Sequence, residues 1–386
     1  MRDPEDELQE LDSAGLRRSL RRLRSAQGPV INTEDSGDLR NFSSNDYLGL
    51  ADSPFLKQVF AEKVQKYGAG SGASRLVCGT MDAHLALEEE MAAFKRSEAA
   101  LTFSAGFATA TGVIPAICQK DDIVILDKLC HASLIDGARM SGATIRVFPH
   151  NDLGKLESHL QWASDQVGQD GRILVVTESV FSMDGDRAPL REIVELKSRF
   201  GALLLVDEAH AFGIIGPNGR GLAAEEGLEG QIDFQMGTFS KALGLSGGYV
   251  CTSRAFVDLL VNRSRSFIYS TAPAPALAAT ISEAVRHVRG TDGDALRKQL
   301  WENIRFLRED APSAILPILM GSNEDAMAAS THLLEQRFLV PAIRYPTVPR
   351  GTARLRVTVS AAHDRRDVIA LRQELDQFQK TALSHP

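Results

Sequence analysis

Short apolar segments alternate with helical segments between residues 99 and 250, and this alternation constrains the fold more than any other feature. The apolar segments cover residues 99–103, 123–126, 144–148, 173–177 and 202–206. Helical patterns lie between them, including residues 133–140 and 190–200. Strands that are apolar on both faces and separated by helices are typical of a mostly parallel sheet covered on both sides. The sequence therefore predicts an α/β architecture.

The length of 386 residues allows two or three domains. We expect an N-terminal helix or arm over residues 1–45, a large α/β domain over 46–289 and a smaller α+β domain over 290–386. In the smaller domain we expect strands at 315–319 and 354–359, with helices near 325–336 and from residue 365. The leucines of residues 5–25 fall near helical spacing, which predicts one helix over that segment.

Charge and composition exclude several classes of function. Lys and Arg number 43 against 50 Asp and Glu, a net charge of −7 that disfavours nucleic acid as a partner. The acidic start lacks an apolar region and the four cysteines are isolated, so we expect a reduced, cytoplasmic protein. Residues 99–119 carry no charge, but their small residues and Pro115 favour a buried strand and helix over a membrane span.

Two motif-like strings do not support the chemistry they suggest. The G-x-G-x-G string at residues 68–72 follows a helical pattern, whereas a dinucleotide site requires a preceding strand. The G-x-S-x-G string at 244–248 runs into a predicted strand, whereas a nucleophile elbow leads into a helix. The nine histidines never cluster at metal-ligand spacing, so no metal site is predicted.

Two polar residues stand at the ends of predicted buried strands. Asp207 closes the apolar segment 202–206, where open α/β sheets bind ligands. Lys241 follows Thr238 in a segment rich in Gly, Ser and Thr. Alone, the aspartate is as consistent with a capping role, and a single lysine is most often a surface residue.

Together these residues satisfy the needs of pyridoxal phosphate. That cofactor requires a lysine, an acid at its ring nitrogen, a flat side chain on its ring and helix N-terminal amides for its phosphate. Lys241 and Asp207 supply the first two. His131 can stack on the ring, His210 can reach the ring hydroxyl, and residues 104–109 with Thr238 can hold the phosphate.

Eight blocks of the chain carry a resemblance to a known family. They are NFSSNDYLGL (41–50), GAGSGASRLVCGT (68–80), SAGFATATG (104–112), DKLCHASLIDG (127–137), TESVFSMDGD (177–186), VDEAHAFGIIGPNGRG (206–221), GTFSKALGLSGGY (237–249) and PTVPRGTARLRVTVSAAH (346–363). In this order they resemble the α-oxoamine synthases, which are fold-type I pyridoxal-phosphate enzymes with an aspartate aminotransferase-like fold. HASLIDG, VFSMDGD and PTVP-x-GTARLR are most similar to the branch that condenses L-alanine with a pimeloyl thioester, carried by coenzyme A or a carrier protein, in biotin biosynthesis. Branches that use glycine and another acyl-CoA share most blocks and remain the alternative.

The resemblance implies a role for each residue of the cofactor site. Lys241 would bind the cofactor covalently and act as acid and base at the substrate Cα. Asp207 would pair with the pyridine nitrogen and His131 would stack on the ring. Ser182 and His210 would contact the ring oxygen. Thr238 and the amides of Gly106 and Phe107 would contact the phosphate.

The resemblance also implies substrate contacts and a partner. Asn45 and Arg356 would hold the amino-acid carboxylate. Thr347 and Arg21 would contact the acyl substrate, with Arg22 nearly as good a match as Arg21. Members of the family are homodimers with active sites at the interface.

In such a dimer, Ser270 and Thr271 would reach the phosphate in the neighbouring subunit.

Overall fold

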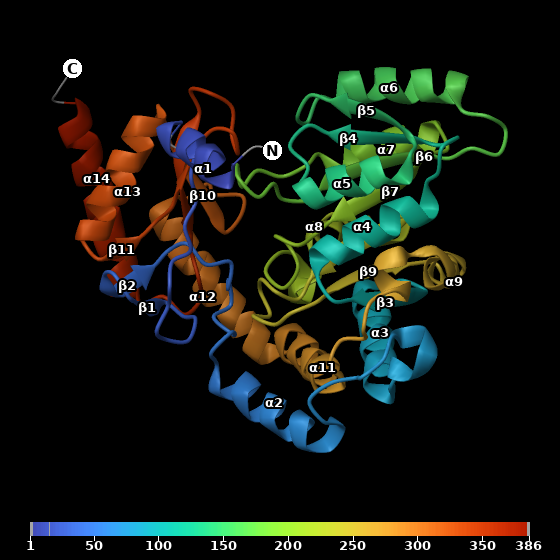
Figure 1. Ribbon diagram of the computed structural model, residues 1–386, viewed down its shortest axis with the longest axis horizontal. Helices are drawn as coiled ribbons and strands as arrows, with labels where there is room; N and C mark the ends of the chain where they lie inside the picture. The colour runs from blue at the N-terminus through green and yellow to red at the C-terminus, as the bar shows by residue number, and fades with distance from the viewer. Residues whose placement is uncertain (1–2, 15, 384–386) are drawn as a thin grey trace.

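A seven-stranded sheet lies at the centre of the computed structural model, which describes residues 3–14 and 16–383. Its strands follow the order β3-β9-β8-β7-β6-β4-β5, and only β9 runs antiparallel to the others (Figure 1). The bounds are β3 Ala99–Phe103, β4 Ile123–Asp127, β5 Thr144–Phe148, β6 Ile173–Glu178, β7 Leu203–Asp207, β8 Phe234–Thr238 and β9 Gly248–Thr252. The five predicted apolar segments are all strands of this sheet, so the predicted α/β architecture is confirmed.

Helices cover both faces of the sheet, which explains why its inner strands are mostly apolar on both faces. One core cluster contains residues of α4 (Gly106–Ile117), α5 (Ala132–Ser141) and α9 (Arg254–Arg263). The other cluster contains residues of α3 (Asp82–Lys95), α6 (Leu153–Gln166), α7 (Leu190–Arg199) and α11 (Pro275–Arg289). Along β4, Ile123 and Ile125 belong to the second cluster, whereas Val124 and Leu126 belong to the first. Alternate side chains therefore enter opposite cores, and neither face can be polar.

The C-terminal part forms a smaller antiparallel sheet with helices. It contains β10 (Ile315–Gly321), β12 (Ala342–Ile343) and β13 (Ala353–Thr358), with α13 (Asn323–Glu335) and α14 (Arg365–Leu383). Helix α12 (Thr291–Leu307) follows α11 and leads the chain from the large sheet to this part (Figure 1). The predicted domain boundaries stay a prediction.

The segment before residue 45 contributes strands of its own. β1 (Val30–Thr33) and β2 (Gly37–Asn41) form an antiparallel pair, and β11 (Phe338–Leu339) adds to β2 in parallel. The N-terminal segment thus packs with the C-terminal part of the chain.

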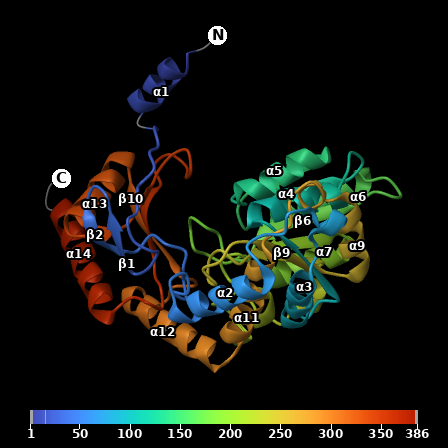
Figure 2. The same ribbon diagram turned by 60° about the horizontal axis from the view of Figure 1, so that its bottom comes forward.

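The prediction of one helix over residues 5–25 is wrong. Helix α1 covers only Pro4–Ser13, and it projects away from the rest of the molecule (Figure 2). No residue of α1 is buried, so no tertiary packing stabilises a longer helix. The backbone of Arg24 instead donates to Asn32 of β1, and Leu23 forms a bridge with Thr33. Residues 22–24 therefore pair with β1 instead of continuing the expected helix.

The remaining elements are short or connect the larger ones. They are α2 (Pro54–Tyr67), the π-helix η1 (Arg75–Gly79), η2 (Pro217–Gly219), α8 (Leu222–Glu225), η3 (Glu229–Gln231) and α10 (Arg265–Ile268). Residues 99–119 form β3 and α4 with their flanking turns, as expected. Among the described residues, no helix is long and apolar enough to cross a bilayer.

Candidate active site

Polar side chains gather where neighbouring parallel strands end. Asp127, Glu178, Asp207 and Thr238 are the last residues of β4, β6, β7 and β8, which are adjacent in the sheet. Glu178 and Asp207 are direct register partners across β6 and β7. The C-terminal edge of a parallel sheet is where α/β proteins bind ligands, because helix N-termini and loops converge there. This edge is the candidate site.

Lys241 lies at this edge in a hydrogen-bonded chain with two other side chains. Its Nζ is 2.8 Å from Nε2 of His210, whose Nδ1 is 2.6 Å from the hydroxyl of Tyr47. Burial lowers the pKa of Lys241 to about 8, although the charges of Asp207 and Glu178 oppose that shift. A large fraction of this lysine is therefore neutral near pH 8, the state required of a nucleophile or a base.

Asp207 and Glu178 form a pair of buried acids beside Lys241. Burial raises the pKa of Asp207, and the positive charge of Lys241 counteracts it. The pKa of Glu178 is raised well above its ordinary value by burial and then by the charge of Asp207. Two adjacent carboxyl groups resist losing both protons, which is why the charge of Asp207 adds to burial in raising the pKa of Glu178.

His131 begins helix α5 and faces the same group of charges. Its backbone N–H donates to Oε1 of Glu178 at 2.5 Å, and its Nδ1 lies 2.8 Å from Oγ of Ser133. Partial burial and the charge of Lys241 lower the pKa of His131. Its imidazole is thus neutral at physiological pH and can serve as a flat stacking surface.

The N-terminus of α4 meets Thr238 and forms an anion cradle. No side chain caps this helix, so its first amides, those of Gly106 and Phe107 among them, lack intrahelical partners. A Cβ placed on Gly106 would lie 3.2 Å from Cβ of Thr238, which explains the glycine. Oγ of Ser240 lies 2.7 Å from Oγ1 of Thr238. Free amides at a helix N-terminus beside two hydroxyls suit a phosphate group.

Arg356 joins three distant segments at the edge of the site. Its Nε donates to the carbonyl oxygen of Ser182 at 2.6 Å, and its Nη2 donates to Oδ1 of Asn45 at 3.2 Å. Arg356 is a buried residue of β13, while Ser182 follows β6 and Asn45 precedes α2. A buried guanidinium with an amide beside it is a fitting donor set for a carboxylate.

The loop that carries Ser182 is anchored to β4 through His150. Nδ1 of His150 lies 3.0 Å from Asp127, and its Nε2 lies 2.7 Å from Asp186. Burial acts to lower the pKa of His150, but the hydrogen bonds to Asp127 and Asp186 outweigh it and raise the pKa to about 10. The imidazolium therefore ties the loop to the strand that precedes His131.

Replacing His150 with glutamine is expected to lower the free energy of unfolding by about 2 kcal/mol at neutral pH, because charged hydrogen bonds are lost. The pKa of His150 is higher in the folded state than in the unfolded state. Its protonation therefore stabilises the folded protein fully below about pH 6.5, and this contribution disappears as the pH rises through about 10. Urea unfolding from pH 6 to 10 should therefore show a flatter profile for His150→Gln than for the wild type. His159→Gln, in α6, is the control, and parallel profiles for wild type and His150→Gln would contradict the assignment.

The predicted contacts to the acyl substrate and to the neighbouring subunit's phosphate lie outside this cluster. Arg21 is exposed in the irregular segment after α1, and Thr347 is exposed in the loop before β13. No hydrogen bond within the described residues joins either side chain to the cluster. Arg22, the alternative to Arg21, is paired with Glu34 at 3.2 Å. Thr271 is exposed and forms an isolated bridge with Ser74.

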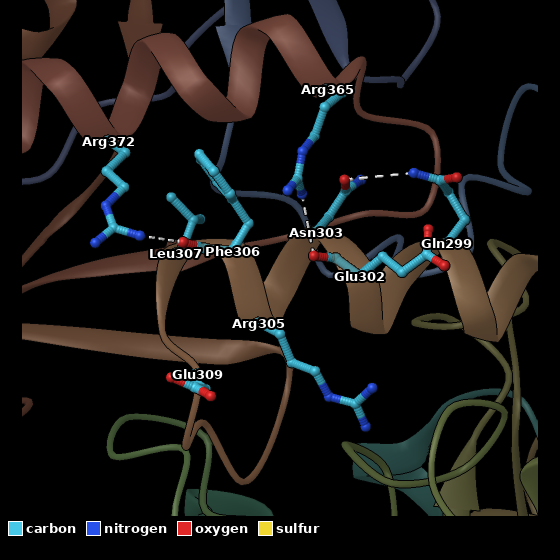
Figure 3. A pocket seen from close by; sticks show the side chains of 9 residues that line it. All are labelled: Gln299, Glu302, Asn303, Arg305, Phe306, Leu307, Glu309, Arg365 and Arg372. Carbon is cyan, nitrogen blue, oxygen red and sulfur yellow. Dashed lines mark hydrogen bonds between the residues drawn. The ribbon is translucent and has the colours of Figure 1, made fainter.

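A separate pocket of about 790 Å³ lies between α12 and α14 (Figure 3). Two of its arginines are engaged with α12: Arg365 donates to the carbonyl oxygen of Glu302, and Arg372 donates to that of Phe306. Both guanidiniums also lie over the ring of Phe306. The pocket contains none of the predicted site residues, and its arginines satisfy the carbonyls near the helix end.

Comparison with known proteins assigns the family. Residues 38–375 match the family described as aminotransferase class I and II. Curated relatives named 8-amino-7-oxononanoate synthase include one from Geobacter sulfurreducens, 47% identical over 94% of both chains. Another, from Thermoanaerobacter pseudethanolicus, is 41% identical over 97% of this chain and 96% of its own. The chain belongs to the α-oxoamine synthase family.

Solved α-oxoamine synthases have the same fold. A serine palmitoyltransferase from S. paucimobilis, solved with a bound adduct of pyridoxal phosphate and myriocin, has a TM-score of 0.89 at 30% identity. It matches 98% of this chain and 96% of its own. An 8-amino-7-oxononanoate synthase from Francisella tularensis has a TM-score of 0.74 at 28% identity, over 90% of this chain and 98% of its own. This α-oxoamine synthase is thus a pyridoxal-phosphate-dependent enzyme of fold type I, as its sequence blocks implied.

Sequence reasoning did not assign roles to three residues of this α-oxoamine synthase site. Tyr47 lies inside the block NDYLGL, but nothing in its neighbours along the chain indicates a contact with His210. Glu178 ends an apolar strand just as Asp207 does, and that shared position was a usable signal. Ser240 was visible between Thr238 and Lys241 in the block GTFSKALG.

Proposed function

We propose that this enzyme condenses L-alanine with a pimeloyl thioester to form 8-amino-7-oxononanoate, releasing carbon dioxide and the thiol, in biotin biosynthesis. Eight curated relatives, at 41–47% identity, are named 8-amino-7-oxononanoate synthase, and this observation supports the proposal most directly. The amine of Lys241 and the buried acid Asp207, both at the sheet edge, also suit a reaction that passes through an amino-acid carbanion.

The residues of the cradle and the sheet edge fit pyridoxal phosphate. In our proposal, Thr238 and the amides of Gly106 and Phe107 bind the phosphate. Asp207 pairs with the ring nitrogen, and Lys241 binds the cofactor covalently.

The ring itself contacts three further residues in our proposal. His131 stacks on its face, and Ser182 and His210 lie at its oxygen. When bound, this cofactor supplies an electron sink for a carbanion at the substrate Cα.

The chain's own side chains bind the amino acid and move its proton. Arg356 and Asn45 hold the carboxylate of L-alanine, so that its Cα is presented to Lys241. The amine of Lys241, with its pKa lowered to about 8, takes the Cα proton and later returns one. Arg21 and Thr347 contact the acyl donor.

We further propose a cytoplasmic homodimer with active sites at the interface. Ser270 and Thr271 then reach the phosphate bound in the partner subunit. The exposed side chains of Phe107, beside the cradle, and Tyr269, beside Ser270, are 51% and 73% accessible in the single chain. Apolar surface of this kind next to a site is consistent with burial by a second subunit.

The decisive experiment measures thiol release from pimeloyl-CoA by the purified, cofactor-loaded enzyme. We expect release with L-alanine and little or none with glycine. Release with glycine alone would contradict the proposal and favour the alternative, an α-oxoamine synthase that uses glycine and another acyl-CoA.

The same assay with pimeloyl-acyl carrier protein identifies the carrier. If coenzyme A thioester gives no release and the carrier-protein thioester does, the proposed reaction holds with a protein-bound donor. If both are inactive with either amino acid, the proposed reaction is wrong.

A further inference from the structure

Tyr47 is a buried phenol that contacts both halves of the candidate site. It is fully buried, and its hydroxyl lies 2.6 Å from Nδ1 of His210 and 3.3 Å from Oδ1 of Asn45. The positive charge of Arg356 also acts on this hydroxyl and favours its ionised form. The phenol therefore connects the proposed carboxylate-binding pair, Asn45 and Arg356, with the residue that faces Lys241.

Hydrogen bonds hold the backbone segment that carries Tyr47 in one position. The carbonyl oxygen of Tyr47 accepts from the amide of Ala361, and its amide donates to the carbonyl oxygen of Asn45. The neighbouring carboxylate of Asp46 accepts from the amides of Leu50 and Ala51, which closes the turn. A side chain held in this way can orient its partner with little loss of conformational freedom.

The partners of the phenol determine the direction of its hydrogen bond. A guanidinium can only donate, so Arg356 is not an acceptor for the single proton of the phenol. Two acceptors are in reach, and Asn45 Oδ1 is the more distant one and already accepts from Arg356. The shorter contact, 2.6 Å to Nδ1 of His210, favours a bond donated by Tyr47 to that nitrogen.

The charge states of both groups support this direction. Burial raises the pKa of Tyr47 to about 12, although the charge of Arg356 opposes the shift, so the phenol keeps its proton. The pKa of His210 is well below its ordinary value because of burial and the charges of Lys241 and Arg356. A neutral imidazole carries one proton, and if Nδ1 accepts, that proton lies on Nε2.

We propose that Tyr47 is a positioning residue that, in the cofactor-loaded enzyme, fixes His210 as the Nε2–H tautomer, with its N–H directed at the reacting groups beside Lys241. This inference rests on the proposed function, in which the same N–H faces the ring oxygen of the cofactor. Without the phenol, Nδ1 loses its donor and both tautomers of His210 become accessible. The donor that faces the reacting groups would then be present only part of the time.

The first test measures the tautomer of His210 by nitrogen NMR of the full-length protein labelled with ¹⁵N-histidine, with and without pyridoxal phosphate. The signals of His210 are those that vanish in His210→Asn. We expect a protonated Nε2 and an unprotonated Nδ1 in the cofactor-loaded wild type, in which Lys241 is not an ammonium. A protonated Nδ1 in the loaded enzyme would overturn the proposal, and this measurement needs no Tyr47 variant to fold.

The second test compares Tyr47→Phe with Tyr249→Phe. Tyr249 is equally buried, but its hydroxyl has no hydrogen-bond partner within the described residues, so it is a matched control. We expect mixed His210 tautomers and a kcat about tenfold lower in Tyr47→Phe, the size of one lost hydrogen bond. Tyr249→Phe should retain the wild-type tautomer.

The readouts separate this proposal from the proposed function. An unchanged tautomer in Tyr47→Phe would overturn the positioning role even if kcat fell. A wild type that shows the Nε2–H tautomer but has no synthase activity would leave the tautomer assignment standing and contradict the function instead.

Discussion

Lys241→Ala is expected to reduce turnover by about 10⁴-fold or more, because one substitution removes both the covalent attachment of the cofactor and the base at Cα. Lys241 is placed for both tasks by the β8–β9 connection, and its Nζ lies 2.8 Å from His210. The measurement is the steady-state rate of thiol release with L-alanine and the pimeloyl thioester. An active Lys241→Ala enzyme would contradict the assignment of the site.

A second readout tests Lys241 without catalysis. Borohydride reduction of the loaded wild type should leave the cofactor attached to the peptide that contains Lys241. The rate of attachment to cofactor-free protein should rise with pH through about 8, since only the neutral amine is nucleophilic. Lys120→Ala, at an exposed lysine, is the control and should behave as the wild type.

Asp207→Asn is expected to lower kcat by about 10²- to 10³-fold while cofactor binding persists. The carboxylate is buried at the end of β7, and its Oδ1 accepts from the amide of Ala209 at 2.9 Å. Asparagine can retain that bond, but its amide group is neutral and cannot stabilise a protonated ring nitrogen. The electron sink would then be weaker although the packing is nearly unchanged.

The measurement for Asp207→Asn is the single-turnover rate with L-alanine, together with a cofactor titration. Asp165→Asn, on the exposed side of α6, is the matched control for the same chemical change. Near-normal turnover in Asp207→Asn would show that the ring nitrogen does not depend on this acid.

The alternating apolar segments were sufficient to predict the large sheet, and the motif blocks named most of the residues that the structure gathers at the candidate site. The bounds of β3 (Ala99–Phe103) match the predicted segment because both-face burial leaves a local apolar signature. Asp207 was found because it follows such a segment directly, and Thr238 and Lys241 because they lie together in the block GTFSKALGLSGGY (237–249). These signals are local in sequence.

The N-terminal segment shows where local patterns fail. Its leucine spacing predicted a helix over residues 5–25, yet residues 22–24 pair with β1 instead. Leucine spacing reports only that a helix could present an apolar face. Whether another element buries that face depends on residues far away, and here none does.

By itself, the sequence determined the α/β sheet, the family and the residue types of the cofactor site. Only the tertiary structure decided which side chains lie against the residues of the site. It places Tyr47 on His210, Glu178 beside Asp207, and His150 between Asp127 and Asp186. The reason is physical. Strand and helix patterns arise from contacts that repeat along the chain, whereas buried hydrogen bonds join residues that are far apart in sequence and adjacent only after folding.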